Sequence, residues 1–179
     1  AIFLLYLALG HVARLVGLPL AIVYHAARVL AGLGLLAMLY ALVVRLSRDG
    51  RAQRWLFWLT AATAGLGWLG SLVGLLPVDL WVPEAFAFFS LLTNPHFPLT
   101  LALMLAAVYS VLWPAPGLRR WLLPALCGAV LGAVSPFALV ILYATFAACL
   151  AWLAIGTARR DGRRAGVVPG GVAALALAA

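Results

Sequence analysis

The chain has 179 residues, of which 67% are hydrophobic and 9% are charged, and its formal net charge is +8. Soluble domains are about half apolar and a quarter charged, and a chain of this size cannot hide so much apolar surface from water. The composition therefore excludes an ordinary soluble domain and predicts an all-α, polytopic membrane protein whose solvent is the bilayer. The basic residues are all arginines, and most of them cluster at the ends of apolar runs, which is typical of membrane topology, so no nucleic-acid partner is expected.

The first half of the chain predicts a short helix followed by two membrane spans. Residues 1–16 form an apolar segment that we expect as a juxtamembrane helix, ended by a Gly-Leu-Pro sequence. Pro19 suits the first turn of a new helix, and the span predicted for 19–45 is long enough to cross about 30 Å of hydrocarbon. The next predicted span covers 55–76, with two tryptophans near its start as interfacial anchors.

The second half predicts an external loop and further spans. Residues 77–84 are expected as a loop, followed by the aromatic sequence AFAFFSLLTN as a short segment at the membrane surface. Ser135-Pro136 is the predicted break in a long apolar run. The predicted spans are 97–113, 121–134 and 136–157, with the start of a further span at 166–179. We expect four to six transmembrane helices in a single domain, belonging to the central part of a longer protein because both ends lie inside apolar runs.

Arginine-rich loops orient the predicted spans. Cytoplasmic loops of membrane proteins carry an excess of basic residues, so we place the loops 46–54, 114–120 and 158–165 in the cytoplasm. This orientation leaves 77–96 outside. It favours two crossings for the run 121–157, because a single crossing would expose its four closing arginines outside.

Two arginines remain unexplained by topology. Arg14 and Arg28 each end the same pattern, His-Val-Ala-Arg and His-Ala-Ala-Arg. Arg28 lies about 14 Å into its helix, where an unpaired arginine costs at least about 2.5 kcal/mol. It therefore needs an acidic partner, backbone carbonyls, a water-filled cavity or a phosphate, and His25 lies on the same face. For Arg14, an interfacial anchor is the alternative to anion binding.

The external loop gathers polar groups that a chain poor in charge otherwise avoids. Asp79 and Glu84 are two of only four acidic residues, and Asn94 and His96 follow them. The carboxylates are either simply solvated, or paired with Arg28, or able to bind a divalent cation, hydrogen-bond a sugar, or act as a base. Asn94 and His96 are either a helix cap with an interfacial imidazole or donors to phosphate or sugar. Three histidines are too few for a pair of stacked haems, and no metal-ligand cluster is evident.

Two stretches resemble one family. GLPLAIVYHAARVLAGLGLLAMLYALVVRLSRDGRAQRWLFWLTAATAGLGW resembles the second and third spans of the GT-C class of integral-membrane glycosyltransferases, and DLWVPEAFAFFSLLTNPHFPLTLALML is similar to bacterial proteins of this kind. The resemblance covers roughly residues 1–157. It concerns the order and lengths of the apolar segments and their loops, together with a few matching residues. It implies that Arg28 matches the family's arginine near the start of the second span. The family's usual catalytic aspartate, in the first external loop, would precede the sequence given.

The expected function is transfer of a sugar from a polyprenyl-phosphate carrier to an acceptor on the non-cytoplasmic face of a bacterial inner membrane. The expected partners are membrane lipid and the polyprenyl-phosphate-linked sugar, and a divalent cation is the one cofactor considered. Two rivals remain, a transporter or flippase-like binder of an amphiphilic anion and a non-catalytic subunit of a membrane complex. The candidate catalytic residues are Asp79 and Glu84, and the candidate phosphate- or substrate-binding residues are Arg28, His25, His96, Asn94 and Arg14.

Overall fold

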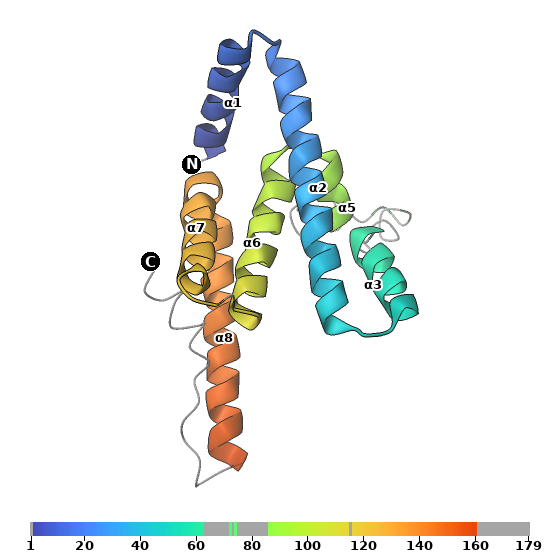
Figure 1. Cartoon of the computed structure of the whole chain (residues 1–179), viewed down its shortest axis with the longest axis vertical. Helices are drawn as coiled ribbons and strands as arrows, with labels where there is room; N and C mark the ends of the chain where they lie inside the picture. The colour runs from blue at the N-terminus through green and yellow to red at the C-terminus, as the bar shows by residue number, and fades with distance from the viewer. Residues whose placement is uncertain (1, 63–71, 73, 75–85, 115, 161–179) are drawn as a thin grey trace.

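Every regular element in the described part of the chain is an α-helix (Figure 1), as the composition predicts. The structure, a computed structural model, describes residues 2–62, 72, 74, 86–114 and 116–160. Its helices are α1 (Ile2–Val16), α2 (Leu20–Leu46), α3 (Gly50–Ala62), α5 (Ala87–Leu92), α6 (His96–Leu112), α7 (Arg119–Val134) and α8 (Pro136–Arg160).

The first two helices form an antiparallel hairpin. Gly17 has a positive φ of 70°, a backbone conformation that glycine adopts without steric cost, and Pro19 stands at the N-cap of α2. The chain therefore reverses at the predicted Gly-Leu-Pro sequence, and α1 lies beside the first half of α2 (Figure 1). Both helices match their predicted ranges to within one residue.

The loop predicted for 46–54 is wrong, because α3 begins at Gly50. The Asp49 carboxylate accepts hydrogen bonds from the backbone N–H groups of Arg51 (3.0 Å) and Ala52 (3.3 Å), which is the N-cap arrangement that stabilises the first turn of a helix. The helix predicted for 55–76 thus starts five residues early, and its described part ends at Ala62.

The helices of the second half follow the predicted segments with small shifts. The aromatic segment is helical as α5, and α6 begins one residue before its predicted start. The predicted loop 114–120 is shorter, because Arg119 opens α7. The break at Ser135-Pro136 is confirmed, and α8 continues to Arg160, past its predicted end. The loop 77–84 and the segment 166–179 lie outside the described residues.

Helix α6 occupies the centre, between α2 on one side and α7 on the other (Figure 1). Toward α2 it packs in a cluster of buried residues, Leu35, Leu39, Ala61 and Ala102. Toward α7 and α8 it packs in a second cluster, Ala107, Leu131, Ala138 and Leu142. The small side chains of α6 in both clusters allow close approach of the neighbouring helices.

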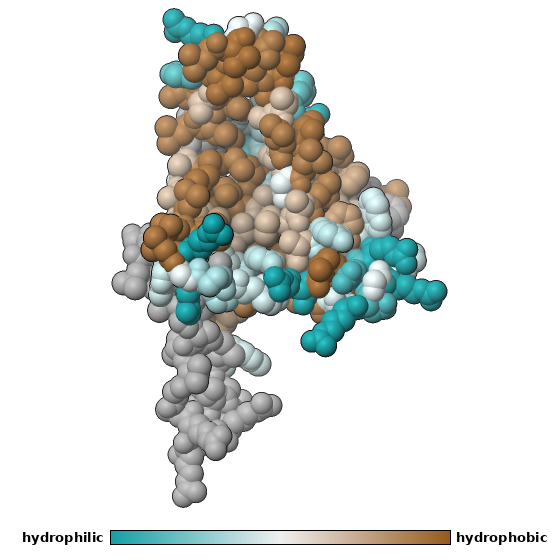
Figure 2. Space-filling view, in the orientation of Figure 1, coloured by the Kyte–Doolittle hydropathy of each residue, from teal (hydrophilic) through white to brown (hydrophobic). Residues whose placement is uncertain are grey.

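Much of the apolar side-chain surface is left exposed, as the brown flanks in Figure 2 show. Among the described residues, α2 is the one helix that is long and apolar enough to cross a membrane, and only 22% of its most apolar window is buried. Three shorter apolar stretches accompany it, Leu4–Val16, His96–Leu112 and Pro136–Trp152. A core helix of a soluble protein would be mostly buried, so the exposure of α2 agrees with a role in a membrane, whereas the number of spans stays a prediction.

Candidate functional site

Six polar or aromatic side chains meet where α1, the first half of α2 and the junction between α5 and α6 come together. The side-chain hydrogen bonds that connect these segments join residues that are 64 to 90 positions apart in the sequence. The residues, which we call the polar cluster, are Tyr6, Tyr24, His25, Arg28, Asn94 and His96. Four of them are among the predicted site residues.

The most buried member of the polar cluster is His96, at the first residue of α6, with 7% of its surface exposed. Its Nδ1 atom lies 2.8 Å from the Tyr6 hydroxyl, and its ring lies against that of Phe97, with the centroids 4.0 Å apart and the planes tilted by 40°. Burial, and secondarily the neighbouring Tyr24 phenol, raise the pKa of Tyr6. The Tyr6 hydroxyl donates to Nδ1 when His96 carries its proton on Nε2 and accepts from Nδ1 in the other tautomer.

The two tyrosines tie the helical hairpin to the α5–α6 junction. The rings of Tyr6 and Tyr24 stack with centroids 6.2 Å apart. Tyr24 donates its hydroxyl proton to Asn94 Oδ1 over 2.6 Å, and the exposed ring of His25 meets Tyr24 edge-on at 5.5 Å. The polar cluster is thus organised around a pair of phenols, with His25 at its solvent- or lipid-exposed edge.

Arg28 caps the end of a helix. Its NH1 group donates to the carbonyl of Leu92 over 3.2 Å, and Leu92 is the last residue of α5, where helix carbonyls lack intrahelical partners. A backbone carbonyl is one of the partners that the sequence required for this arginine. Because a guanidinium carries five N–H donors, this bond leaves most of them for other acceptors, and Arg28 is only partly buried.

An apolar hollow of about 620 Å³ lies along α2 from Ala21 to Leu30, with His25 in the middle of its lining. It is widely open and contains no charged side chain among its described lining residues, Ala21, Ile22, His25, Ala26, Val29 and Leu30. An apolar surface of this kind, which includes an imidazole of the polar cluster, is suited to a hydrocarbon chain whose polar end lies at the cluster.

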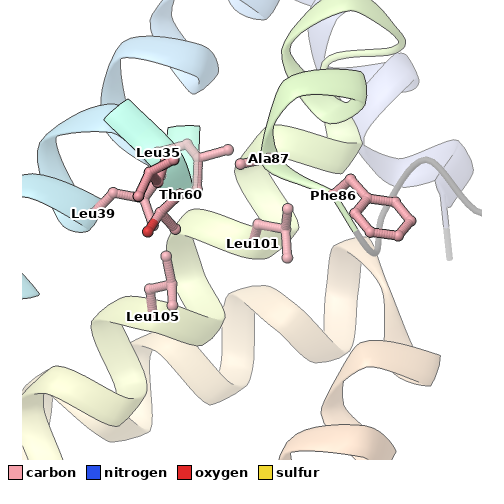
Figure 3. A pocket seen from close by; sticks show the side chains of 8 residues that line it. Leu35, Leu39, Thr60, Phe86, Ala87, Leu101 and Leu105 are labelled. Carbon is pink, nitrogen blue, oxygen red and sulfur yellow. The ribbon is translucent and has the colours of Figure 1, made fainter. Parts of the chain in front are cut away.

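A second cavity, of about 310 Å³, lies deeper, between α2, α3, α5 and α6 (Figure 3). Leucine side chains dominate its lining, among them Leu35, Leu101 and Leu105. The Thr60 hydroxyl in this wall donates to the carbonyl of Leu56 over 2.7 Å. The described lining therefore offers apolar space and no group suited to acid–base chemistry.

The other predicted site residues are not part of the polar cluster as described. Arg14 lies exposed in the last turn of α1, about 12 Å along the helix axis from Tyr6. Asp79 and Glu84 lie outside the described residues, so their pairing with Arg28 and their catalytic roles stay predictions. Within the described part of the chain, no three His, Cys, Asp or Glu side chains gather as metal ligands would.

Sequence reasoning missed Tyr6 and Tyr24. A usable signal was present, because each tyrosine interrupts an aliphatic run and Tyr24 directly precedes His25. A tyrosine in such a run buries its ring while its hydroxyl seeks a hydrogen-bond partner. Of the two cysteines, Cys127 is half-buried and Cys149 is exposed.

Arginines and aromatic residues gather at the opposite end of the helices, which Figure 2 shows as a hydrophilic band. There the Nε group of Arg45 donates to the Tyr109 hydroxyl over 3.0 Å, and the guanidinium carbon Cζ of Arg45 lies 5.9 Å from the centre of the Tyr109 ring. We call this region, which includes Arg45, Arg48, Arg51, Arg54, Arg119 and Arg120, the arginine end. Figure 1 places the ends of α2 and α6 and the start of α7 together at this side.

Comparisons with protein-family models, with curated proteins and with solved structures find no match for this chain.

Proposed function

We propose that the chain is a membrane-embedded, GT-C-like glycosyltransferase unit whose polar cluster binds the phosphate of a polyprenyl-phosphate-linked sugar. The observation that carries this proposal is the meeting of Arg28, His25 and two tyrosines beside an open apolar hollow on α2. A ligand with a negatively charged headgroup and a long hydrocarbon tail would match both the polar cluster and the apolar hollow.

The spacing of polar residues along α2 supports the membrane placement. Seventeen residues separate Arg28 from Arg45, which corresponds to about 26 Å along a helix, and Tyr24 lies about 32 Å from Arg45. The hydrocarbon core of a bilayer is about 30 Å thick. The polar cluster and the arginine end therefore fit opposite boundaries of one bilayer, with the arginine end cytoplasmic by its positive charge.

The donors of the polar cluster suit a phosphate. An arginine binds phosphate oxygens through parallel N–H donors, and the donors of Arg28 that do not contact Leu92 are available from the partly exposed side. The exposed imidazole of His25 adds an N–H donor. The prenyl chain would follow the hollow along Ala26 and Val29 toward the centre of the bilayer.

The chemistry of transfer gives these residues their expected roles. The acceptor hydroxyl attacks the anomeric carbon, the bond from that carbon to the phosphate oxygen breaks, and negative charge grows on the leaving phosphate. Arg28 would stabilise that charge. A carboxylate must take the proton of the hydroxyl. Asp79 and Glu84 are the candidates in this sequence, and the family resemblance implies an aspartate in an earlier external loop.

A non-catalytic role is the second candidate, and the Arg28–Leu92 hydrogen bond favours it. Together with the Tyr24–Asn94 bond, it fastens α2 to the α5–α6 junction. In that case the polar cluster holds helices together and has no affinity for phosphate.

Binding of a polyprenyl phosphate to the chain in nanodiscs separates the two candidates. Arg28→Gln removes the guanidinium from the polar cluster, and Arg14→Gln is its matched control, because the same residue type ends the same four-residue pattern elsewhere. A charge-assisted hydrogen bond contributes about 1.5–3 kcal/mol, so Arg28→Gln should weaken binding about 10- to 150-fold, whereas Arg14→Gln leaves it unchanged.

Polyprenol without phosphate serves as the ligand control. Equal affinity for the alcohol, or equal losses in the two variants, would remove the phosphate site. Transfer of a labelled sugar from the same carrier, measured with and without Arg28→Gln, then tells an enzyme from a binding protein.

A further inference from the structure

The first two turns of α3 present two arginines and two tryptophans on one face. Arg51, Arg54, Trp55 and Trp58 follow the i, i+3, i+4, i+7 spacing that places side chains along one side of a helix. They line an open hollow of about 450 Å³ at the arginine end. The tryptophans leave 69% and 65% of their surfaces exposed, which is unusual for the largest apolar side chain unless something covers it.

The charge of this face is not balanced by the described residues around it. The segment 45–54 contains four arginines and one aspartate, a net charge of +3. Asp49, the one acidic residue in the described part of the chain, accepts the backbone N–H groups of Arg51 and Ala52 at the start of α3. Arg54 donates through Nε to the carbonyl of Gly50 over 3.3 Å, a bond that does not use its terminal NH groups.

We infer that this face of α3 is a binding site for the headgroup of an anionic membrane phospholipid, with the phosphate between Arg51 and Arg54. The inference rests on the membrane placement proposed above and concerns the end of the molecule opposite the polar cluster. The positive charge of Arg51 and Arg54 favours an anionic ligand. The two indole rings favour an anion that is part of a lipid, because tryptophan prefers the boundary between headgroups and hydrocarbon.

The dimensions of the face agree with a bilayer interface. Arg51 and Trp58 are about 10 Å apart along the axis of α3. The headgroup region adds roughly 5–8 Å to each side of the hydrocarbon core. With the arginines at the level of the phosphates, the rings lie at the level where the acyl chains begin, so one lipid contacts all four side chains.

Lipid-dependent thermal unfolding of the detergent-solubilised chain tests this site. Phosphatidylglycerol is titrated and the apparent affinity is taken from the rise of the unfolding midpoint. Phosphatidylcholine and inorganic phosphate form the two other arms. Each arginine near an anionic surface contributes about a factor of five, so the double variant Arg51→Gln/Arg54→Gln should bind phosphatidylglycerol roughly 30-fold more weakly. The matched control is Arg119→Gln/Arg120→Gln, which removes two arginines from the same end and should keep the affinity within about twofold.

A second variant, Trp55→Leu/Trp58→Leu, keeps the charge and removes the rings, and it should show a smaller but measurable loss. The site is refuted if both arginine pairs cause equal losses, or if phosphatidylcholine or inorganic phosphate stabilises the chain as well as phosphatidylglycerol does. Polyprenyl-phosphate binding is measured on the same variants. It should be unchanged in Arg51→Gln/Arg54→Gln, so failure of this site and failure of the polar cluster are seen separately.

Discussion

Replacing Tyr6 with phenylalanine should destabilise the protein more than the same change at Tyr24, although each removes one hydroxyl that makes one hydrogen bond. Tyr6 is bonded to Nδ1 of His96, which is 7% exposed, whereas Tyr24 is bonded to the exposed Asn94. A hydrogen bond contributes about 1 kcal/mol net on average, and the loss of a hydrogen bond to a buried group costs about 1–3 kcal/mol. We therefore expect a loss of about 2 kcal/mol for Tyr6→Phe and at most about 1 kcal/mol for Tyr24→Phe.

The assay is thermal unfolding in nanodiscs followed by circular dichroism. For a chain of this length, 1 kcal/mol corresponds to roughly 2–4 °C, so Tyr6→Phe should lower the midpoint by about 4–8 °C. Repeating Tyr6→Phe in a His96→Phe background isolates the pair, and the change should then cost less than about 0.5 kcal/mol. Equal effects of Tyr6→Phe and Tyr24→Phe, or an undiminished effect without His96, would refute the reasoning.

Three further changes probe the packing and the titration of the fold. Leu131→Ala should lower the free energy of unfolding, measured with denaturant, by about 2–5 kcal/mol, because the Leu131 side chain is 0% exposed in the cluster between α6, α7 and α8. Leu126→Ala, at an exposed position, should lower it far less. Gly32→Leu should cost about 1–3 kcal/mol by thermal unfolding, because even a Cβ at Gly32 lies 3.0 Å from Leu91 Cδ2; an unchanged midpoint would mean that α5 does not pack there. The free energy of unfolding should fall as pH rises from 9 through 11. The pKa of Tyr6 is raised in the folded protein above its value of about 10 in the unfolded chain, so the stabilisation is fully present below the pKa of the unfolded chain and is lost as pH rises through the pKa of the folded protein. Tyr6→Phe should make the free energy of unfolding less dependent on pH in this range.

The helix pattern was largely predictable because its signals are local. Gly-Leu-Pro and Ser135-Pro136 interrupt helices through glycine's conformational freedom and proline's missing N–H, and both breaks are confirmed. The start of α3 was misjudged because Asp49-Gly50 favours a turn as well as an N-cap. Only the carboxylate bonds to Arg51 and Ala52 decide between the two.

The polar cluster was predictable in part. The cost of placing Arg28 in an apolar helix singles it out, and the outer loop predicted to contain Asn94 and His96 indicates a place near it. That Tyr6 meets His96 across 90 residues follows from how α1 folds back along α2 and reaches α6, which no local signal in the sequence carries. The same limit explains Arg14, whose four-residue pattern differs from that of Arg28 at one position but which lies on α1 away from the polar cluster.

The most direct test of the central claim is the sidedness of the polar cluster and the arginine end in a bilayer. Single cysteines are introduced as Asn94→Cys and Arg48→Cys, both at exposed positions, after Cys127 and Cys149 are replaced with alanine. A membrane-impermeant maleimide is then added to oriented vesicles that contain the protein. The account predicts that the two positions react from opposite sides. Reaction of both from one side would contradict it.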